Sequence, residues 1–236
     1  CKMSIIKSNI KLGNIFFKYR TYIPILFIFP LLIISSIKPQ LFFRTNNIWL
    51  ALCFFVTCIG QCIRIFTLGY TPKGTSGRNT GRQLASSLNT KGIYSIVRNP
   101  LYLANYFIWL GASMYSVSYI LVIIITLIFI VYYERIIISE EKFLTEKFKQ
   151  NYVNFCKNTP AIIPNFKNYK NSDYQFSVKK VLKEEYSSTL STVITFLYVE
   201  FIINTFILHQ SNVLIQLPEK INTYIIILAT SVIITL

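Results

Sequence analysis

Acidic residues and histidine are both scarce in this sequence. Only 9 of the 236 residues are aspartate or glutamate, against 24 lysines and arginines, and the single histidine is His209. His209 lies far from the polar segments, and the sequence shows no Ser/His/Asp set, histidine-rich box or Walker loop, so metal chemistry is not supported. The five cysteines contain no CxxC pair, so the sequence predicts neither a disulfide framework nor a metal ion.

Charge of either sign is also sparse. Charged residues make up 14% of the chain and hydrophobic residues 53%, with a mean hydropathy of +0.49. This composition is typical of a multispanning membrane protein. The net charge of +15 is also found in nucleic-acid binders, but here lysine and arginine lie between apolar runs and not on one face of a soluble fold. We therefore expect a membrane-embedded chain with no nucleic-acid partner.

Apolar runs of about 17–25 residues predict transmembrane helices. The third and fourth runs are separated by a very short turn, so they should form a tight helical hairpin. The fold class predicted is all-α, a polytopic membrane protein of about six transmembrane helices in one domain, 1–236, divided into 1–91, a core motif region 92–168, and 169–236. The six runs lie near residues 22–37, 47–67, 99–115, 118–137, 189–208 and 221–236.

The distribution of positive charge predicts an orientation. Residues 1–21, 68–98 and 134–188 hold five, five and ten lysines and arginines, and the alternate loops hold few. Cationic loops are retained on the cytoplasmic side, which places both termini and the two long polar segments there. Richness in Ile, Asn, Lys, Phe and Tyr suggests an AT-rich genome, which fits a bacterium, and we expect the protein in the bacterial inner membrane. Arg64 and Glu200 lie inside apolar runs, where an unpaired charge is costly, and we expect them to pair with each other.

Two polar stretches flank the predicted hairpin. The first, "GIYSIVRNPLYLANYFIWLG" at 92–111, places Arg98 and Asn99 directly before an apolar run, with Pro100 suited to the first turn of a helix. The second contains Glu140 and Glu141. Five residues of this stretch recur at steps of three or four, which predicts that they lie on one face of a continuous helix: Glu140, Leu144, Phe148, Tyr152 and Phe155. Pro160 and Pro164 are expected to end this helix.

This ordered set resembles the integral-membrane methyltransferases that include isoprenylcysteine carboxyl methyltransferase and the phospholipid N-methyltransferases. The resemblance implies a cytoplasmic pocket for S-adenosyl-L-methionine, with Arg98, Asn99 and Glu140 as catalytic residues. It depends on Gly92, Tyr94, Arg98, Asn99, Pro100, Tyr102, Glu140, Glu141, Phe148, Tyr152 and Pro164, and all of these except Phe148 and Pro164 are implied to bind the cofactor.

The chain departs from the family pattern at several positions. Asn99 replaces a histidine, Ala104 and Lys149 stand where glycines are usual, and Phe155 replaces a second tyrosine. Asparagine keeps a hydrogen-bond donor and acceptor but does not titrate near neutral pH. A role that requires a charged imidazole is therefore excluded at position 99.

A loop rich in hydrogen-bond donors suggests which substrate the protein binds. "KGTSGRNTGRQ" at 73–83, with "GNIFFKYR" at 13–20, resembles a bacterial branch of lipid A phosphate methyltransferases, which implies that Arg78, Asn79 and Arg82 bind the substrate. Arginine suits phosphate binding; equally, the loop could simply contact anionic head groups. Because no histidine or other base is evident near this site, we favour an anionic lipid oxygen such as lipid A 1-phosphate. The alternatives are an isoprenylcysteine carboxyl group, phosphatidylethanolamine, an NADPH-dependent sterol-type reductase, and a non-catalytic transporter or scaffold.

Overall fold

The computed structural model describes residues 2–20, 46–72, 75, 83 and 85–203. The regular secondary structure of these residues is helical, apart from one isolated antiparallel bridge between Gly92 and Lys170. The elements are α1 (Lys2–Tyr19), α5 (Asn47–Gly69), η1 (Ile93–Ser95), α6 (Pro100–Tyr115), α7 (Tyr119–Phe148), α8 (Gln150–Asn158), η2 (Phe166–Asn168) and α9 (Val178–Ile202).

Two of the helices, α5 and α7, are long and apolar enough to cross a membrane by length and composition. The predicted tight hairpin is confirmed, because α6 ends at Tyr115 and α7 begins at Tyr119. Of the other predicted spans, 22–37 and 221–236 lie outside the described residues and 189–208 lies only partly within them. The all-α class is thus seen throughout the described residues, with two candidate spans among them.

Side chains at the helix starts explain where several of these elements begin. The Asn46 side chain accepts hydrogen bonds from the backbone N–H groups of Ile48 and Trp49, at 2.9 and 3.3 Å, and so caps α5. Ser118 and Ser177 cap α7 and α9 in the same way. These side chains satisfy N–H groups that lack a partner within the helix.

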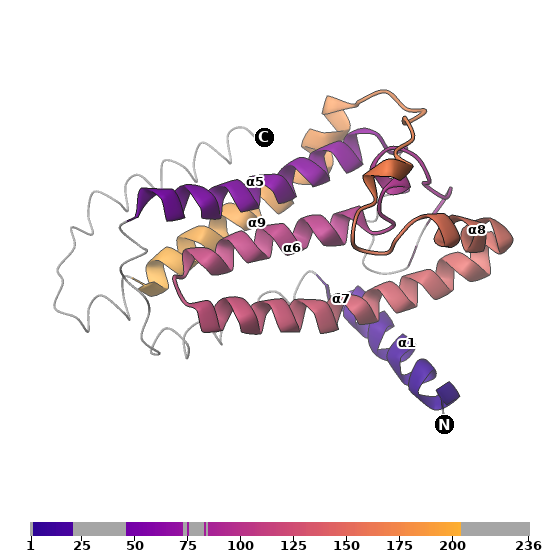
Figure 1. The fold of residues 1–236 in the computed structure, drawn as a ribbon, viewed down its shortest axis with the longest axis horizontal. Coiled ribbons are helices and arrows are strands. Elements are labelled where there is room, and N and C mark those ends of the chain that lie inside the picture. The colour runs from indigo at the N-terminus through magenta and orange to yellow at the C-terminus, as the bar shows by residue number, and fades with distance from the viewer. Residues whose placement is uncertain (1, 21–45, 73–74, 76–82, 84, 204–236) are drawn as a thin grey trace.

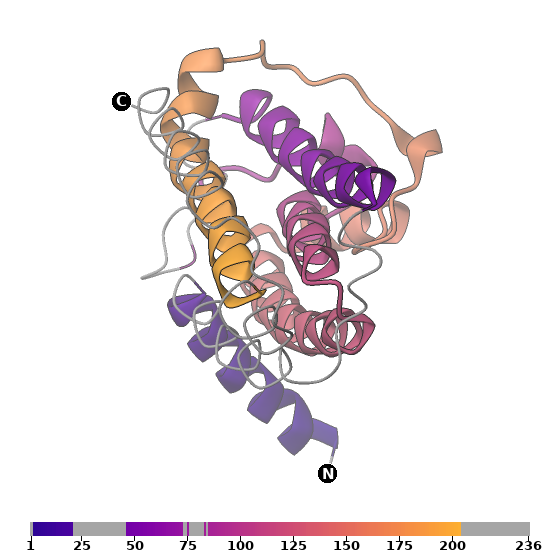
Figure 2. The same cartoon turned by 90° about the vertical axis from the view of Figure 1, so that its left-hand side faces the viewer.

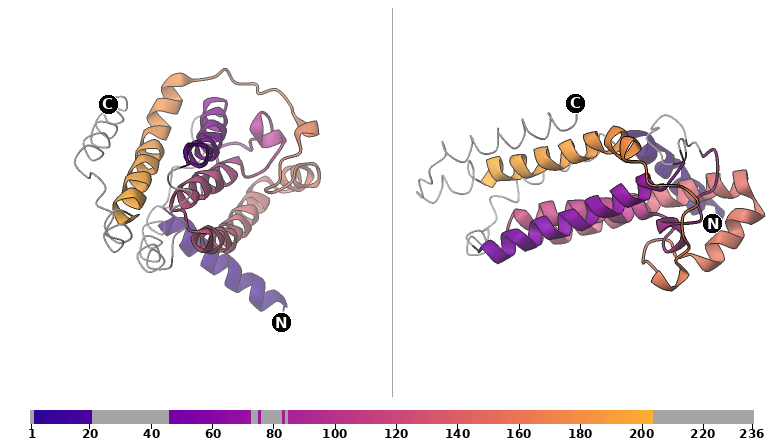
Figure 3. Two further views of the ribbon diagram at one scale, coloured as in Figure 1. Left: turned by 60° about the vertical axis from the view of Figure 1, so that its left-hand side comes forward. Right: turned by 90° about the horizontal axis from the view of Figure 1, so that it is seen from above.

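The helices α5, α6, α7 and α9 run roughly along one direction, and the polar connections gather at one end (Figure 1). A view from above gives the same arrangement, with α8 at the end where α5 terminates (Figure 3). α5 packs mainly on α6, and α1 packs on α7. The segments on either side of the α6–α7 hairpin therefore meet at the same end of the bundle.

The α5–α6 interface depends on small residues. A Cβ atom added at Gly111 would lie 2.1 Å from Thr57 Oγ1, and one at Gly60 would lie 2.5 Å from the carbonyl oxygen of Ala104. A larger side chain at either position would keep α5 and α6 further apart. Small residues allow close packing of membrane helices in this way.

α9 runs antiparallel to α5. Lys180, near the start of α9, attaches it to the C-terminal end of α5. The buried Lys180 ammonium donates to the Thr71 carbonyl at 2.7 Å and to the Leu68 carbonyl at 3.0 Å. Nearer the start of α5, Gln61 Nε2 donates to Thr192 Oγ1 of α9 at 3.0 Å. This register fixes which residues of the two helices face each other.

The expected pairing of Arg64 with Glu200 is wrong. Arg64 Nη2 and Nε instead donate to the two carboxylate oxygens of Glu185, at 2.7 and 2.8 Å, while Glu200 accepts a 2.7 Å hydrogen bond from Tyr115. The antiparallel register explains the difference. Arg64 lies near the end of α5 and so meets the start of α9, whereas Glu200 lies about 22 Å further along α9 at 1.5 Å per residue.

The predicted continuous helix through Phe155 is also wrong. α7 ends at Phe148 and α8 begins at Gln150, because Lys149 has φ 49° and ψ −126°. This conformation suits glycine, which carries no Cβ atom. The break changes the direction of the chain and turns α8 back toward the start of α6 (Figure 1).

We predict that Lys149→Gly stabilises the protein. A non-glycine residue in this region costs about 1–3 kcal/mol, which exceeds the roughly 0.5–1 kcal/mol that glycine loses through chain entropy. The expected gain is about 1 kcal/mol, measured as a higher Tm in detergent micelles. Lys147→Gly is the matched control, because Lys147 is exposed in the last helical turn of α7 and glycine there should lower the Tm. A fall in Tm for both variants would contradict the prediction.

Candidate functional site

A cavity of about 780 Å³ extends from the polar end of the bundle into its apolar interior. At the polar end the side chains come from the start of α6, the end of α7 and from α8. The inner part of the cavity is lined by apolar side chains of α6, α7 and α9. The polar lining includes Tyr94, Arg98, Asn99, Tyr102, Glu140, Glu141 and Tyr152, and the apolar lining includes Ile108, Trp109, Ala112, Leu121, Ile125 and Ile194.

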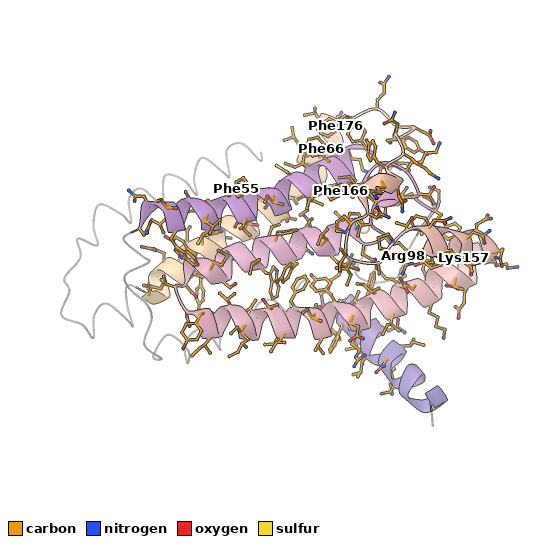
Figure 4. The ribbon with its side chains drawn as sticks, in the orientation of Figure 1. Phe55, Phe66, Arg98, Lys157, Phe166 and Phe176 are labelled. Atoms are coloured by element: carbon orange, nitrogen blue, oxygen red, sulfur yellow. The ribbon has the colours of Figure 1, made fainter. Side chains whose placement is uncertain are left out.

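Arg98 connects α6, α7 and α8. Its Nη1 donates to the carbonyl oxygens of Cys156 and Thr159, both at 3.0 Å, and its Nη2 donates to Glu141 Oε1 at 2.8 Å. The backbone N–H of Arg98 donates to the Pro160 carbonyl at 2.9 Å. Figure 4 labels Arg98 beside α8. The arginine therefore neutralises the carbonyl end of α8 as well as lining the cavity.

Asn99 and Pro100 form the start of α6. Asn99 Nδ2 donates to the Ala161 carbonyl at 3.0 Å, and its side chain makes no cap hydrogen bond to the helix. Pro100 occupies the first turn, where its missing N–H is not needed. Both residues line the cavity, and Asn99 also holds the segment that follows α8.

Glu140 and Glu141 are adjacent on α7 but face different partners. Glu141 is paired with Arg98, whereas the Glu140 carboxylate accepts a hydrogen bond from the Tyr102 hydroxyl. Both carboxylates line the cavity. Glu140 is therefore the carboxylate whose charge is not already matched by Arg98.

Two tyrosines complete the polar end. Burial, and next the charge of Glu140, raises the pKa of Tyr94, which is also hydrogen-bonded to the Asn89 side chain. Burial, and next the charge of Glu141, raises the pKa of Tyr152. Both hydroxyls stay protonated at neutral pH and can donate hydrogen bonds into the cavity.

Gly92 is the one predicted cofactor residue that is absent from the cavity lining. It has φ 60°, and its N–H donates to the Lys170 carbonyl at 2.8 Å. Its positive φ explains the choice of glycine. Through this bridge Gly92 fixes the loop that carries Tyr94.

The predicted substrate residues Arg78, Asn79 and Arg82 lie outside the described residues. Thr75 and Gln83, on either side of that stretch, line the cavity. Gln83 Nε2 donates to Ser139 Oγ at 2.9 Å, which attaches this position to α7.

Several polar residues that line the cavity were not among the predicted site residues. Arg64 Nη1 donates to Asn105 Oδ1, and Asn105 Nδ2 donates to the Tyr133 hydroxyl at 3.1 Å. Asn105 interrupts an apolar run, and this was the signal that could have identified it. Arg20 at the end of α1 also lines the cavity. Within the described ranges, no group of three or more His, Cys, Asp or Glu residues could hold a metal ion.

Comparison with known proteins finds similar sequences for part of the chain. A family model described as phospholipid methyltransferase matches residues 46–151. The chain is 26% identical over 130 residues to the cobalt-zinc-cadmium resistance protein CzcN of Cupriavidus metallidurans, covering 55% of this chain and 58% of that protein. It is 29% identical over 114 residues to the protein-S-isoprenylcysteine O-methyltransferase of Schizosaccharomyces pombe, covering 45% and 46%. No solved structure gives a significant match.

The match to the family model is partial and includes most of the residues at the polar end of the cavity. The chain spans about half the length of these curated relatives. The matched region begins at the cap of α5 and ends within α8, so it includes the α6–α7 hairpin and the residues from Tyr94 to Glu141 that line the polar end. Residues 46–151 are thus similar to the phospholipid methyltransferases, along the hairpin and the polar end of the cavity.

Proposed function

We propose that this protein is a methyltransferase that transfers a methyl group from S-adenosyl-L-methionine to a membrane lipid. The observation that carries the proposal is the cavity of about 780 Å³, which joins the family motif at its polar end to an apolar interior. One space of this kind can hold a polar cofactor and an acyl or prenyl chain next to each other.

The chemistry of the polar end fits the cofactor. S-adenosyl-L-methionine supplies a methyl group on a positively charged sulfonium, and it carries an ammonium group as well. The Glu140 carboxylate attracts such cations, and the rings of Tyr94, Tyr102 and Tyr152 offer faces on which a cation is stabilised. Arg98 and Asn99 hold α8 and the following segment against this end, so that the reacting groups are aligned and water is excluded.

We infer that the acceptor is an anionic lipid oxygen, with lipid A 1-phosphate as the favoured substrate. An anionic oxygen needs no base, and its charge is neutralised as the methyl group leaves the sulfonium, which a site of low dielectric favours. An isoprenylcysteine carboxylate satisfies the same requirement, and it corresponds to the activity named for the Schizosaccharomyces pombe relative. Phosphatidylethanolamine would first have to lose a proton.

The proposed location is a bacterial inner membrane. About six transmembrane helices would orient both termini and the polar end of the bundle toward the cytoplasm, where the cofactor is available. The excess of lysine and arginine in the segments around that end supports this orientation.

Labelled methyl transfer tests the function. The purified protein in nanodiscs is incubated with S-adenosyl-L-methionine carrying a radioactive methyl group and, separately, with lipid A, N-acetyl-S-farnesylcysteine or phosphatidylethanolamine. We expect label in lipid A and none in phosphatidylethanolamine. Label only in farnesylcysteine would support the second acceptor. Absence of label in all three, or turnover that depends on NADPH, would contradict the proposal.

A further inference from the structure

A hydrogen-bond network along the cavity wall joins α5, α6, α7 and α9. It begins at Glu185 of α9, whose two carboxylate oxygens accept from Arg64 of α5 at 2.7 and 2.8 Å. Arg64 also donates to the side chain of Asn105 on α6, which in turn donates to the Tyr133 hydroxyl on α7 at 3.1 Å. Figure 2 views the bundle nearly end-on and shows α6 between α5 and α7, with α9 to one side. Arg64, Asn105 and Tyr133 all line the cavity.

The chemistry of these groups fixes the direction of each hydrogen bond. A guanidinium has only donors, so the Asn105 atom that faces Arg64 must be its oxygen. The Asn105 nitrogen then faces Tyr133, and an amide nitrogen can only donate. The Tyr133 oxygen is therefore the acceptor in this contact. Within the described residues the hydroxyl makes this one hydrogen bond, so its own hydrogen remains available to a partner in the cavity.

The position of this hydroxyl is fixed by packing. Tyr133 is only 6% exposed. Its ring stacks on Phe129, with the centroids 4.1 Å apart, and lies 4.7 Å from the ring of Tyr102. A buried donor that lacks an acceptor costs free energy, and a ligand oxygen placed opposite it removes that cost. The site therefore favours a ligand with an acceptor oxygen at this point.

Tyr133 lies deeper in the bundle than the residues that we assign to the cofactor. It precedes Glu140 on α7 by seven residues, which is about two helical turns, or roughly 10 Å at 1.5 Å per residue. Residues seven apart share one face of a helix, and both of these line the cavity. The Tyr133 hydroxyl is thus placed between the cofactor end of the cavity and its apolar interior, where the head group of a bound lipid would lie.

We propose that the Tyr133 hydroxyl donates a hydrogen bond to an anionic oxygen of the lipid head group, a phosphate or a carboxylate. Glu185, Arg64 and Asn105 keep the hydroxyl in this donor role. This inference rests on the proposed function, because the lipid is the methyl acceptor assigned there. A head group that presents only donors at this depth is disfavoured, since two donors would then face each other without an acceptor.

Binding of three probes to the chain of 236 residues in dodecyl maltoside tests the assignment. Lysophosphatidic acid carries a phosphate and N-acetyl-S-farnesylcysteine a carboxylate, whereas dodecyltrimethylammonium has an alkyl chain and no acceptor atom. Trp109 lines the cavity and reports binding by fluorescence quenching. The chain contains two tryptophans, so a Trp49→Phe background leaves Trp109 as the single reporter.

Tyr133→Phe removes the hydroxyl and keeps the ring. It should weaken binding of at least one anionic probe by about 10-fold or more, because a hydrogen bond to a charged oxygen is lost, and it should leave dodecyltrimethylammonium binding unchanged. The anionic probe that loses affinity identifies phosphate or carboxylate as the ligand. Tyr132→Phe is the matched control, since the Tyr132 hydroxyl donates to the Phe16 carbonyl at 3.0 Å, and it should bind all three probes as the wild type does. Equal weakening of all three probes by Tyr133→Phe, or no weakening, would overturn the assignment.

Asn105→Asp tests the role of the network. A carboxylate still accepts from Arg64, but it has no hydrogen to donate, so the Tyr133 hydroxyl would turn its own hydrogen toward the carboxylate and away from the ligand. The variant should weaken binding of the anionic probe, and this effect should be smaller when Tyr133→Phe is already present. Effects of the two substitutions that simply multiply would show that Asn105 does not act through Tyr133.

Calorimetry with S-adenosyl-L-methionine separates this inference from the proposed function. The Kd for the cofactor should be the same in Tyr133→Phe and in the wild type, because the hydroxyl lies away from the cofactor end of the cavity. Absence of cofactor binding in the wild type would contradict the proposed function, while the pattern across the three lipid probes tests Tyr133 by itself.

Discussion

Replacing Glu140 by glutamine is expected to weaken binding of S-adenosyl-L-methionine by about 10- to 100-fold, because a charge-assisted interaction is worth roughly 1.5–3 kcal/mol. Glutamine has nearly the same shape and can still accept the Tyr102 hydrogen bond, so the helical bundle should stay folded. The Kd is measured by calorimetry in detergent, and methyl transfer should fall with it.

Glu134→Gln is the matched control. It removes the same charge from α7, but Glu134 is 54% exposed and forms an ion pair with its neighbour Arg135, at 3.6 Å. The predicted role of Glu140 would be rejected if both variants bound S-adenosyl-L-methionine as tightly as the wild type. Arg98 is a less specific position to change, since its removal also leaves the carbonyl groups of Cys156 and Thr159 without their donor.

Replacing Arg64 by methionine should lower the free energy of unfolding by about 3–5 kcal/mol, because it leaves the buried Glu185 carboxylate without its cation. The double variant Arg64→Met, Glu185→Met removes both charges and should recover most of this loss. Unfolding is followed in mixed detergent micelles of increasing SDS content.

The surface pair formed by Lys91 and Asp173 provides the comparison. Its side chains are 48% and 64% exposed, so Lys91→Met should cost no more than about 1 kcal/mol. A double variant at positions 64 and 185 that is as unstable as Arg64→Met alone would show that the pair does not act as a unit.

Much of the site was predictable because its residues are close in sequence to strong local signals. Arg98, Asn99 and Pro100 stand directly before an apolar run, and the two glutamates follow another. A hairpin with a three-residue turn brings these two places to one end of the bundle whatever the details of packing. The family motif could therefore be assembled without coordinates.

Residues that depend on packing were missed or assigned wrongly. Glu185 was not singled out because no local pattern distinguishes it from its neighbour Glu184, and only the register of α9 on α5 brings it to Arg64. Arg20 lies far from the motif in sequence, and only the close contact of α1 with α7 brings it to the cavity. Apolar periodicity continues across Lys149 and gives no sign of the break there, although the family pattern has a glycine at this position.

The sequence by itself determined the membrane class, the helical hairpin and the order of the motif, since each follows from hydropathy and short-range spacing along one chain. Only the tertiary structure decided which carboxylate faces Arg64, where α8 turns back, and that α1 supplies a guanidinium to the cavity. The physical reason is that ion pairs and cavity walls form between helices, and the distances between helices are set by register, close backbone contact and a single backbone dihedral angle.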